Sequence, residues 1–368
     1  YDTLRSPLTA LTEKELSYCE HDVLVLHELI AQFKQIYKHI ANIPYTSTGR
    51  IRRNVKKLMY PIKKNISVCT PTPGIFQMLQ AAFAGGYTHA NAAHVGTVVE
   101  DVHSFDFASS YPAQMLLQKY PSAPFSKEPL SDIKQIDGSN KAYLLTVIFY
   151  NIESRNYWNY ISGHKCTRLI NGTYDNGRIA AADELEITCT EVDIEIISAN
   201  YHFSKCEVLE CYSAPKSYLP KPFTDYIIEL YRDKTKLKDV SGMEQKYLEA
   251  KRFVNGLYGM CVTNTIADTV IFSLLSGWKV EPLKFEDVES GLQDMRKKGF
   301  LNYAWGVWVT AYARRALWKA ILELDYEAVY CDTDSIKYFG NYDKFFRDYN
   351  AEILEQFKRV CADRGYNM

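Results

Sequence analysis

Two aspartates stand two residues apart at the predicted tip of a β-hairpin. The segment Tyr330–Ser335 reads Tyr-Cys-Asp-Thr-Asp-Ser, and β-prone residues lie on both sides of it. This pattern predicts a strand, a tight turn and a second strand, with Asp332 and Asp334 at or beside the turn. Two carboxylates this close repel each other unless a cation lies between them, and a divalent metal ion is the usual solution. An aspartate-rich turn without a metal is also common, so the segment alone leaves both interpretations open.

A third carboxylate closes another predicted strand. Asp106 ends a strand-like run, and a compact turn leads from it to Tyr111 and Pro112. On its own, such an aspartate is often only a helix cap or a turn former. Together with Asp332 and Asp334, it provides the groups that two-metal phosphoryl transfer uses. Hard oxygen ligands select Mg²⁺ or Mn²⁺, so we predict two such ions if the fold places the strand end beside the hairpin tip.

A predicted helix carries groups that suit a nucleoside triphosphate. At about 100° per residue, Lys251, Asn255 and Tyr258 lie on one face of this helix. That face presents an ammonium group for phosphates, an amide, and an aromatic ring for sugar and base. Lys234 and Lys238 add positive charge upstream. The alternative is an ordinary solvated helix face.

A local basic stretch lies between Arg50 and Lys64, which contains seven basic residues and no acidic one. The formal net charge of the whole chain is -1, so any electrostatic signal for nucleic acid must be local. A solvated charged face is one interpretation of the stretch, and contact with backbone phosphates is the other. The residues that we predict to contact DNA here are Arg52, Arg53, Lys56 and Lys57.

The elements that must position these groups alternate irregularly between helix and strand, which favours an α+β fold. The 368 residues are 47% hydrophobic and 24% charged, enough for more than one domain with a sizeable core. Nine cysteines without a Cys-x-x-Cys pair argue against a zinc site and a disulfide framework, and favour a reducing compartment. No apolar run is long enough for a membrane span. We predict helices at 13–38, 222–260 with a break near 239–242, 303–324 and 344–359, strands at 143–150 and 185–189, and a loop at 171–177.

The first of these helices has a clear amphipathic pattern. Thr12 is its predicted N-cap, with Glu15 three residues later. Its predicted apolar stripe consists of Leu16, Val23, Leu26, Leu29, Ile30 and Phe33.

The three chemical segments resemble, in order and in residue type, the motifs of family B DNA polymerases. Asp106-Phe-Ala-Ser109-Ser-Tyr111-Pro112 resembles motif A, and Tyr330–Ser335 matches motif C throughout. The segment from Lys251 to Gly259 resembles motif B. Two departures are visible, because Ser110 replaces the usual leucine and Gly256 replaces the usual serine. Neither departure removes a metal ligand or a charged group.

This resemblance implies a right-hand polymerase, with an antiparallel palm sheet, helical fingers and two insertions. The implied function is template-directed addition of dNMPs to a primer 3′-hydroxyl, with primer-template DNA and dNTPs as partners and no membrane partner. The implied segments are an exonuclease remnant (1–42), the first part of the palm (43–120), an insertion similar to the terminal-protein-binding segment (121–221), fingers (222–261), a second insertion for strand displacement and processivity (262–301), and palm (302–368).

Further similarities point to a subgroup. Tyr18 and Asp22 resemble the third exonuclease motif, and Gly85 and Gly86 lie in a segment similar to the linker between exonuclease and polymerase parts. The lengths of the two inserted segments resemble those of protein-primed polymerases from phages and linear plasmids. This subgroup implies initiation on a terminal protein and action in the cytoplasm of a host cell. A family B polymerase primed by nucleic acid is the main alternative.

We expect the chain to be a fragment, because it begins at Tyr1 in sequence that resembles the middle of a domain. The family's first two exonuclease motifs and its thumb have no counterpart here, so we expect no proofreading and a weak grip on the primer. A DNA-binding fragment with little catalysis is therefore a second alternative. A nuclease is a third, since Tyr18 and Asp22 belong to a nuclease site.

The resemblance also implies roles for individual residues. Asp106 and Asp334 are expected to bridge two metal ions, with Asp332 as an accessory ligand and the Phe107 carbonyl completing one shell. Lys251, aided by Lys238 or Lys234, is expected to neutralise triphosphate charge. The remaining roles are Tyr111 beneath the deoxyribose, Tyr258 beside the nascent pair, Asn255 holding its surroundings, and contact with primer or template by Ser109, Thr333, Gly85 and Gly86.

Overall fold

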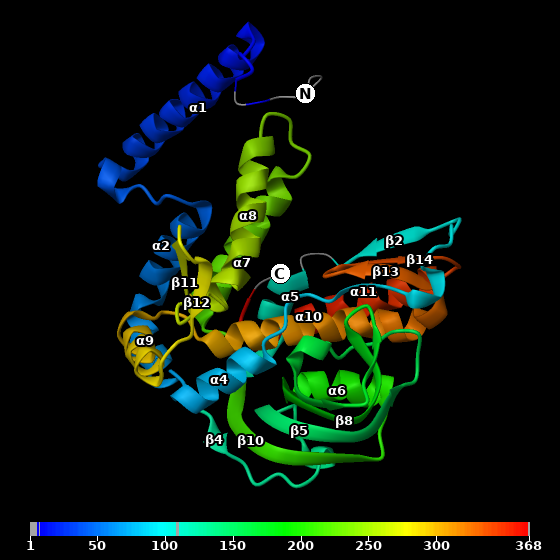
Figure 1. The fold of residues 1–368 in the computed structure, drawn as a ribbon. Coiled ribbons are helices and arrows are strands. Elements are labelled where there is room, and N and C mark those ends of the chain that lie inside the picture. Colours follow the sequence, from blue (N-terminus) through cyan, green and yellow to red (C-terminus); the bar gives the residue numbers. More distant parts are fainter. Residues whose placement is uncertain (1–5, 7, 108–109, 367–368) are drawn as a thin grey trace. The chain divides into compact units, whose positions relative to one another are not determined.

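Four short strands that are far apart in the sequence form one antiparallel sheet in the computed structural model, which describes residues 6, 8–107 and 110–366. Their order is β1 (Thr88–Ala90), β13 (Ala328–Asp332), β14 (Ser335–Tyr338) and β2 (His103–Asp106). The predicted hairpin at Asp332 and the predicted strand end at Asp106 are both confirmed. Because β2 pairs with β14, the strand end lies beside the hairpin, as two-metal chemistry requires. The fold is α+β, as predicted (Figure 1).

Helix α10 (Tyr303–Leu324) is the central element and agrees with the predicted helix at 303–324. It begins at Asn302, whose side chain accepts a hydrogen bond of 3.0 Å from the Ala304 amide. Its first half packs into one hydrophobic core. Its second half packs into another core together with Cys331 and Ile336 of the four-stranded sheet, which we call the palm sheet. Figure 1 shows α10 between this sheet and α6 (Glu191–Asn200). One helix therefore supports both the carboxylate hairpin and the elements below it.

A larger antiparallel sheet is built from residues 119–218, which overlap the predicted insertion at 121–221. The predicted strands at 143–150 and 185–189 are present but longer than expected. The predicted loop at 171–177 is wrong in part, because β7 lies within it. Asn176 and Gly177 have φ values of 43° and 79°, so they form a tight hairpin turn that pairs β7 with β8. The sheet has the order β3 (Lys119–Pro121), β10 (Lys205–Tyr218), β5 (Lys141–Ser154), β8 (Arg178–Thr190), β6 (Cys166–Ile170), with β4 (Ser126–Lys127) on β10, β7 (Thr173–Asp175) on β8 and β9 (Tyr201–His202) on β5.

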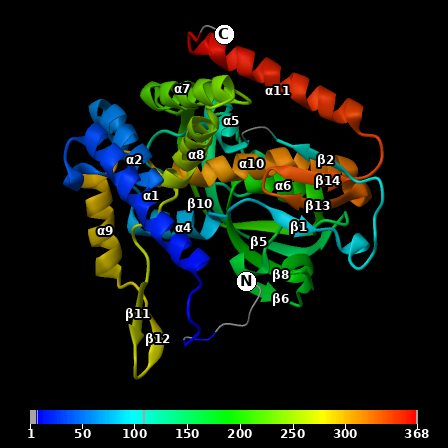
Figure 2. The same cartoon turned by 90° about the horizontal axis from the view of Figure 1, so that it is seen from above.

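Two helices form the predicted fingers. The long helical segment at 222–260 is interrupted as predicted, because α7 (Lys221–Leu237) ends before α8 (Glu244–Cys261) begins. Figure 1 and Figure 2 both show the two helices side by side. Ile51 of α2 (Ser47–Met59) lies so close to Gly256 that a Cβ atom there would be 2.7 Å from the Ile51 Cδ1 atom. A side chain at position 256 would therefore require the end of the Ile51 side chain to move.

The remaining helices and strands lie in the second compact unit, which begins at residue 51. The predicted C-terminal helix is present as α11 (Asp343–Asp363), and no helix among the described residues is long and apolar enough to cross a membrane. The other elements are α3 (Lys63–Val68), α4 (Pro73–Ala82), α5 (Ser110–Leu117), β11 (Thr269–Ser273), β12 (Gly277–Glu281), α9 (Phe285–Lys298), and the short 3₁₀ helices η2 (Tyr60–Ile62), η3 (Ala92–His94), η4 (Ile133–Gln135), η5 (Gly163–Lys165) and η6 (Asp325–Glu327).

Residues 1–50 form a separate compact unit. It contains α1 (Glu13–Tyr37), η1 (Ile40–Asn42) and the first residues of α2. The predicted capping box is confirmed, because Glu15 accepts a hydrogen bond of 2.8 Å from the Thr12 amide. No described residue of α1 is buried, and the predicted apolar stripe is exposed except for the half-buried Phe33, with Leu16 54% and Val23 67% exposed. Its amphipathic pattern therefore predicted the helix but not a buried face.

Candidate active site

The three predicted carboxylates meet at one end of the palm sheet. Ser335 is the register partner of Asp332 on one side and of Asp106 on the other. Directly opposed residues point to the same face, so the two aspartates flank Ser335 about 10 Å apart, which is two strand spacings. Asp334 lies in the turn, and its carbonyl accepts a hydrogen bond of 2.7 Å from the Phe107 amide. The turn is thereby attached to the strand end that carries Asp106.

The electrostatics of Asp334 indicate that a cation would fit here. Partial burial raises the pKa of its carboxyl, and the charges of Asp106 and Asp332 raise the pKa further. Its own backbone amide and the Lys251 ammonium oppose this shift and lower the pKa. The carboxylates therefore repel one another in the protein alone, and a divalent ion beside Asp334 would relieve that repulsion.

The donor set is open rather than a closed cage. Among residues 8–107 and 110–366, no three His, Cys, Asp or Glu side chains converge as a ready-made ligand group. Asp332 Oδ1 already accepts hydrogen bonds from the hydroxyls of Thr88 at 2.9 Å and Thr333 at 3.0 Å. An ion at this site would therefore be held chiefly by Asp106 and Asp334, with oxygens of a substrate or water completing its shell.

Three lysines from two helices form a cationic cluster. Lys234 and Lys238 lie at the end of α7, and Lys251 lies on α8. Burial lowers the pKa of Lys234, and the charges of Lys251 and Lys238 lower this pKa further. The repulsion among these ammonium groups would be relieved by a polyanion such as a triphosphate. Lys251 also acts on the pKa of Asp334, so the cluster borders the carboxylates.

Two tyrosines join the motif A helix to the motif B helix. The rings of Tyr111 on α5 and Tyr258 on α8 stack with centroids 4.2 Å apart and an interplanar angle of 18°. Burial raises the pKa of Tyr111, Arg314 opposes the shift, and Asp334 and Asp332 add to it. The tyrosine pair therefore lies near the carboxylates. Asn255 is exposed on α8, and the predicted contact residue Ser109 lies outside the described residues.

The glycine segment from Ala84 to Thr88 contacts the carboxylate turn directly. A Cβ atom on Gly86 would lie 2.6 Å from the Thr333 side chain, so only glycine fits there. The Tyr87 carbonyl accepts a hydrogen bond of 2.8 Å from the Thr333 amide, which supports a residue with φ of 56°. Gly85 has open space around it and is not required sterically. Gly86 therefore has a packing role against the turn, and the contact of Gly85 and Gly86 with DNA stays a prediction.

A buried residue that the sequence patterns did not predict holds this segment. Arg314 of α10 is only 4% exposed and donates hydrogen bonds to the carbonyls of Ala84 and Gly85. It also pairs with Asp193 of α6 at 2.7 Å. One signal was present in the sequence, because an arginine in the middle of an apolar helix needs a buried partner. The identity of that partner, 121 residues away, carried no comparable signal.

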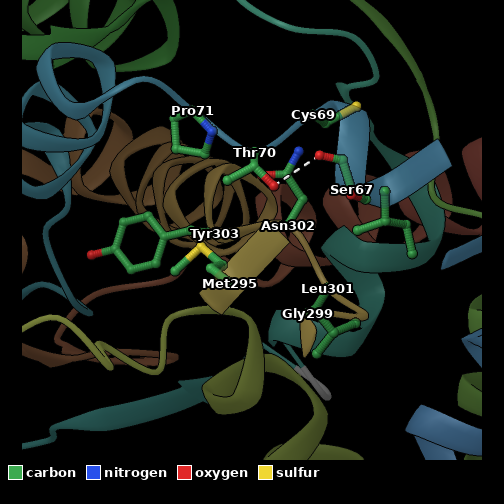
Figure 3. Close-up of a pocket in the computed structure, with 10 residues that line it drawn as sticks. Ser67, Cys69, Thr70, Pro71, Met295, Gly299, Leu301, Asn302 and Tyr303 are labelled. Atoms are coloured by element: carbon green, nitrogen blue, oxygen red, sulfur yellow. Dashed lines mark hydrogen bonds between the residues drawn. The ribbon is translucent and has the colours of Figure 1, made fainter. Parts of the chain in front are cut away.

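The other predicted site residues lie on α1 and α2. Arg53, Lys56 and Lys57 are exposed on α2, whereas Arg52 donates a hydrogen bond of 3.1 Å to Thr263. Tyr18 and Asp22 are exposed one turn apart on α1, in the first compact unit. The carboxylate site is likewise distinct from the small cavity between α3, α9 and the start of α10 (Figure 3). That cavity has a volume of about 10 Å³, room for about one water molecule, so it holds no substrate.

Comparison with known proteins places this geometry in a family. The chain is 26% identical over 355 residues to the DNA polymerase of Bacillus phage Nf, covering 92% of the chain and 55% of that polymerase. It is 23% identical over 333 residues to the DNA polymerase of Bacillus phage phi29, covering 90% and 53%. The chain therefore spans just over half the length of these curated relatives.

The fold comparison agrees with the sequence comparison. The solved structure described as "Phi29 DNA polymerase complexed with primer-template DNA and incoming nucleotide substrates (ternary complex)" matches with a TM-score of 0.66 and 20% identity. The match covers 95% of this chain and 57% of that one. The sequence profile of the family described as "DNA polymerase type B, organellar and viral" matches residues 2–349. The chain therefore belongs to the organellar and viral family of type B DNA polymerases.

Proposed function

We propose that this chain carries the catalytic centre of a template-directed DNA polymerase that adds dNMPs to a primer 3′-hydroxyl. One observation carries the proposal. Asp334 lies within electrostatic reach of Asp106, Asp332 and Lys251, so groups from two strands and one fingers helix act on a single carboxyl. A carboxylate centre bordered by ammonium groups suits the transfer of a nucleotide from a triphosphate.

Each residue has a role that follows from its position. Lys251, Lys234 and Lys238 bind the triphosphate and hold it beside the carboxylates. The stacked rings of Tyr111 and Tyr258 would form an apolar platform for the sugar and base. The resemblance to family B polymerases further implies that the Tyr111 ring excludes a 2′-hydroxyl. Thr88 and Thr333 hold Asp332 by hydrogen bonds, so Asp332 shapes the site while Asp106 and Asp334 remain available.

Two divalent ions complete the proposed centre. Asp106, Asp334 and the Phe107 carbonyl would hold Mg²⁺ or Mn²⁺, with Asp332 as an accessory group. When bound, such ions lower the pKa of an attacking hydroxyl and neutralise the leaving pyrophosphate.

The partners follow from the proposed reaction. Primer-template DNA and dNTPs are supported by the phi29 polymerase structure that contains both. We propose a terminal protein as the initiating primer, supported by the similarity to phage polymerases, and the host cytoplasm as the place of action. The exposed row Arg53, Lys56 and Lys57 would grip backbone phosphates without reading sequence.

Primer extension tests the proposal. The chain with a labelled primer-template and dNTPs should extend the primer in Mg²⁺, stop with EDTA, and resume when Mg²⁺ is restored. Asp334→Asn should lower the rate about a thousandfold or more, because metal-held charge contributes several kcal/mol to the transition state. Asp294→Asn is the matched control, since Asp294 is exposed on α9 and pairs with Lys298.

Each outcome separates the alternatives. An unchanged rate in Asp334→Asn would remove the metal assignment. Salt-dependent DNA binding without extension would favour a binding fragment. Addition of the first dNMP to a terminal protein hydroxyl would establish protein priming, and its absence would favour a polymerase primed by nucleic acid.

A further inference from the structure

Five consecutive residues connect a buried arginine to the carboxylate turn. Ala84 and Gly85 offer their carbonyls to the Arg314 guanidinium. The next three residues contact the turn, because Gly86 packs on Thr333, Tyr87 accepts from the Thr333 amide, and Thr88 donates to Asp332. Residues 84–88 therefore contact both Arg314 and the turn, so a shift of Arg314 would shift the turn.

The other end of Arg314 is held by Asp193 of α6 and by Tyr160, which lies between β5 and η5. Its Nη2 donates to Asp193 Oδ1 at 2.7 Å, and its Nε donates to the Tyr160 hydroxyl at 2.7 Å. Asp193 Oδ2 accepts from the amide of Thr190 at 3.0 Å and from its hydroxyl at 2.7 Å. Asp193 Oδ1 is thus held by Arg314, and Asp193 Oδ2 is held by Thr190 at the end of β8.

We propose that Arg314 is a positioning residue that sets the geometry of the Asp332–Asp334 turn relative to α6, through residues 84–88. This rests on the proposed function for its effect on catalysis, but not for its effect on the turn. A guanidinium suits the task, because its fixed fork can engage a carboxylate, a hydroxyl and two carbonyls at once. A lysine in its place has no such fork.

The molecule contains a matched network for comparison. Glu191, also on α6, is fully buried and pairs with Lys216 at 2.5 Å. It accepts a hydrogen bond of 2.8 Å from Trp308 of α10. This network joins the same two helices with similar burial and a similar carboxylate, yet it makes no hydrogen bond to residues 84–88 in the described part of the chain. Variants in the Glu191 network should therefore lower stability without moving the Asp332–Asp334 turn.

Two pairs of variants compare the Arg314–Asp193 network with the Glu191–Lys216 network. Tyr160→Phe removes the hydrogen bond that Tyr160 donates to Asp193 and the one that it accepts from Arg314. Trp308→Phe removes the hydrogen bond that Trp308 donates to Glu191. Arg314→Lys is the stronger change in the first network, with Lys216→Met as its counterpart in the second. Tyr160→Phe keeps the test open if Arg314→Lys does not fold.

Hydrogen exchange at the Thr333 amide is the primary readout. We expect exchange there to rise at least tenfold in Arg314→Lys and severalfold in Tyr160→Phe, and to stay within twofold of the original in Trp308→Phe at equal margins below each melting temperature. The half-saturating Mg²⁺ concentration for primer extension should rise in the first two variants only.

The outcomes divide cleanly. Equal exchange at Thr333 in Tyr160→Phe and Trp308→Phe, or no rise in Arg314→Lys, overturns the proposal. A rise in exchange in a chain that never extends a primer would retain the positioning role and reject the proposed function.

Discussion

Asp193 and Asp334 are two carboxylates with opposite surroundings. Asp193 is only 4% exposed, and its burial alone would raise its pKa, yet the Arg314 charge and several hydrogen bonds outweigh burial and lower the pKa. Asp334 lies at the surface, yet partial burial and two neighbouring carboxylates raise its pKa. The burial of a carboxyl group therefore does not by itself decide the direction of its pKa shift. The neighbouring charges and hydrogen bonds decide it. The charge of Asp193 is paired with Arg314 within the chain, whereas the charge of Asp334 lies beside the like charges of Asp106 and Asp332.

Neutralising each carboxyl should have opposite effects on stability. Asp193→Asn leaves the Arg314 charge buried without its counterion, so it should cost about 3–5 kcal/mol of unfolding free energy. Asp334→Asn removes a mutually repelled charge, so the metal-free variant should be at least as stable as the original. Urea unfolding in the presence of a chelator measures both. A comparable loss in Asp334→Asn would mean that its carboxyl is structural, and the comparison would fail.

The pH dependence should also differ in sign. Asp193 has a lowered folded pKa, so its stabilising effect is complete above the unfolded value of about 3.9 and is lost only as the pH falls through the folded pKa. Asp334 has a raised folded pKa, so its destabilising effect is present above that pKa and is relieved as the pH falls through it.

Unfolding measured from pH 7 down to about pH 4 tests this difference in sign. Over that range, the stability gap between Asp334→Asn and the original should shrink toward zero, while the gap for Asp193→Asn should stay constant. Mg²⁺ at pH 7 should stabilise the original chain and leave Asp334→Asn unaffected. A gap for Asp334→Asn that does not change with pH would show that its carboxyl has an ordinary pKa.

The same contrast explains what could be predicted from the sequence. The hairpin at Asp332, the strand end at Asp106 and the break between α7 and α8 rest on local patterns of turn and strand residues, and all are present. The apolar stripe of α1 shows the limit of local pattern, because periodicity predicts a helix but says nothing about what covers it. The pairing of Arg314 with Asp193 depends on tertiary geometry across 121 residues, which no spacing rule contains.

Gly256 and Gly86 show a second limit. A glycine in a motif B helix predicts only some loss of helix stability. The structure shows that the end of the Ile51 side chain, from another helix, lies close to Gly256 and would have to move for a larger residue. Gly86 is more constrained, because a Cβ atom there would meet the Cβ and both γ atoms of Thr333. Sequence alone identifies such positions as unusual, but the packing partners appear only in the fold.

The stacked tyrosines give the prediction with the smallest expected effect. It compares the apolar ring pair with the charged carboxylate site beside it. The Tyr258 ring lies against the Tyr111 ring, so it should hold Tyr111 in place as the barrier to a 2′-hydroxyl. Tyr111→Val should therefore raise ribonucleotide use strongly, and Tyr258→Leu should raise it less, because the barrier remains but loses its support. A stability coupling of about 0.5–1.5 kcal/mol between Tyr111→Leu and Tyr258→Leu is expected for stacked rings.

The ratio of NTP to dNTP incorporation distinguishes this barrier from a general loss of activity. Tyr258→Phe keeps the ring and serves as the control, with sugar discrimination unchanged. If Tyr258→Leu lowers both incorporation rates equally, the stack supports the fold and not the choice of sugar. If only NTP use rises, discrimination depends on how firmly one ring is held, just as the pKa of Asp193 depends on how completely its charge is paired.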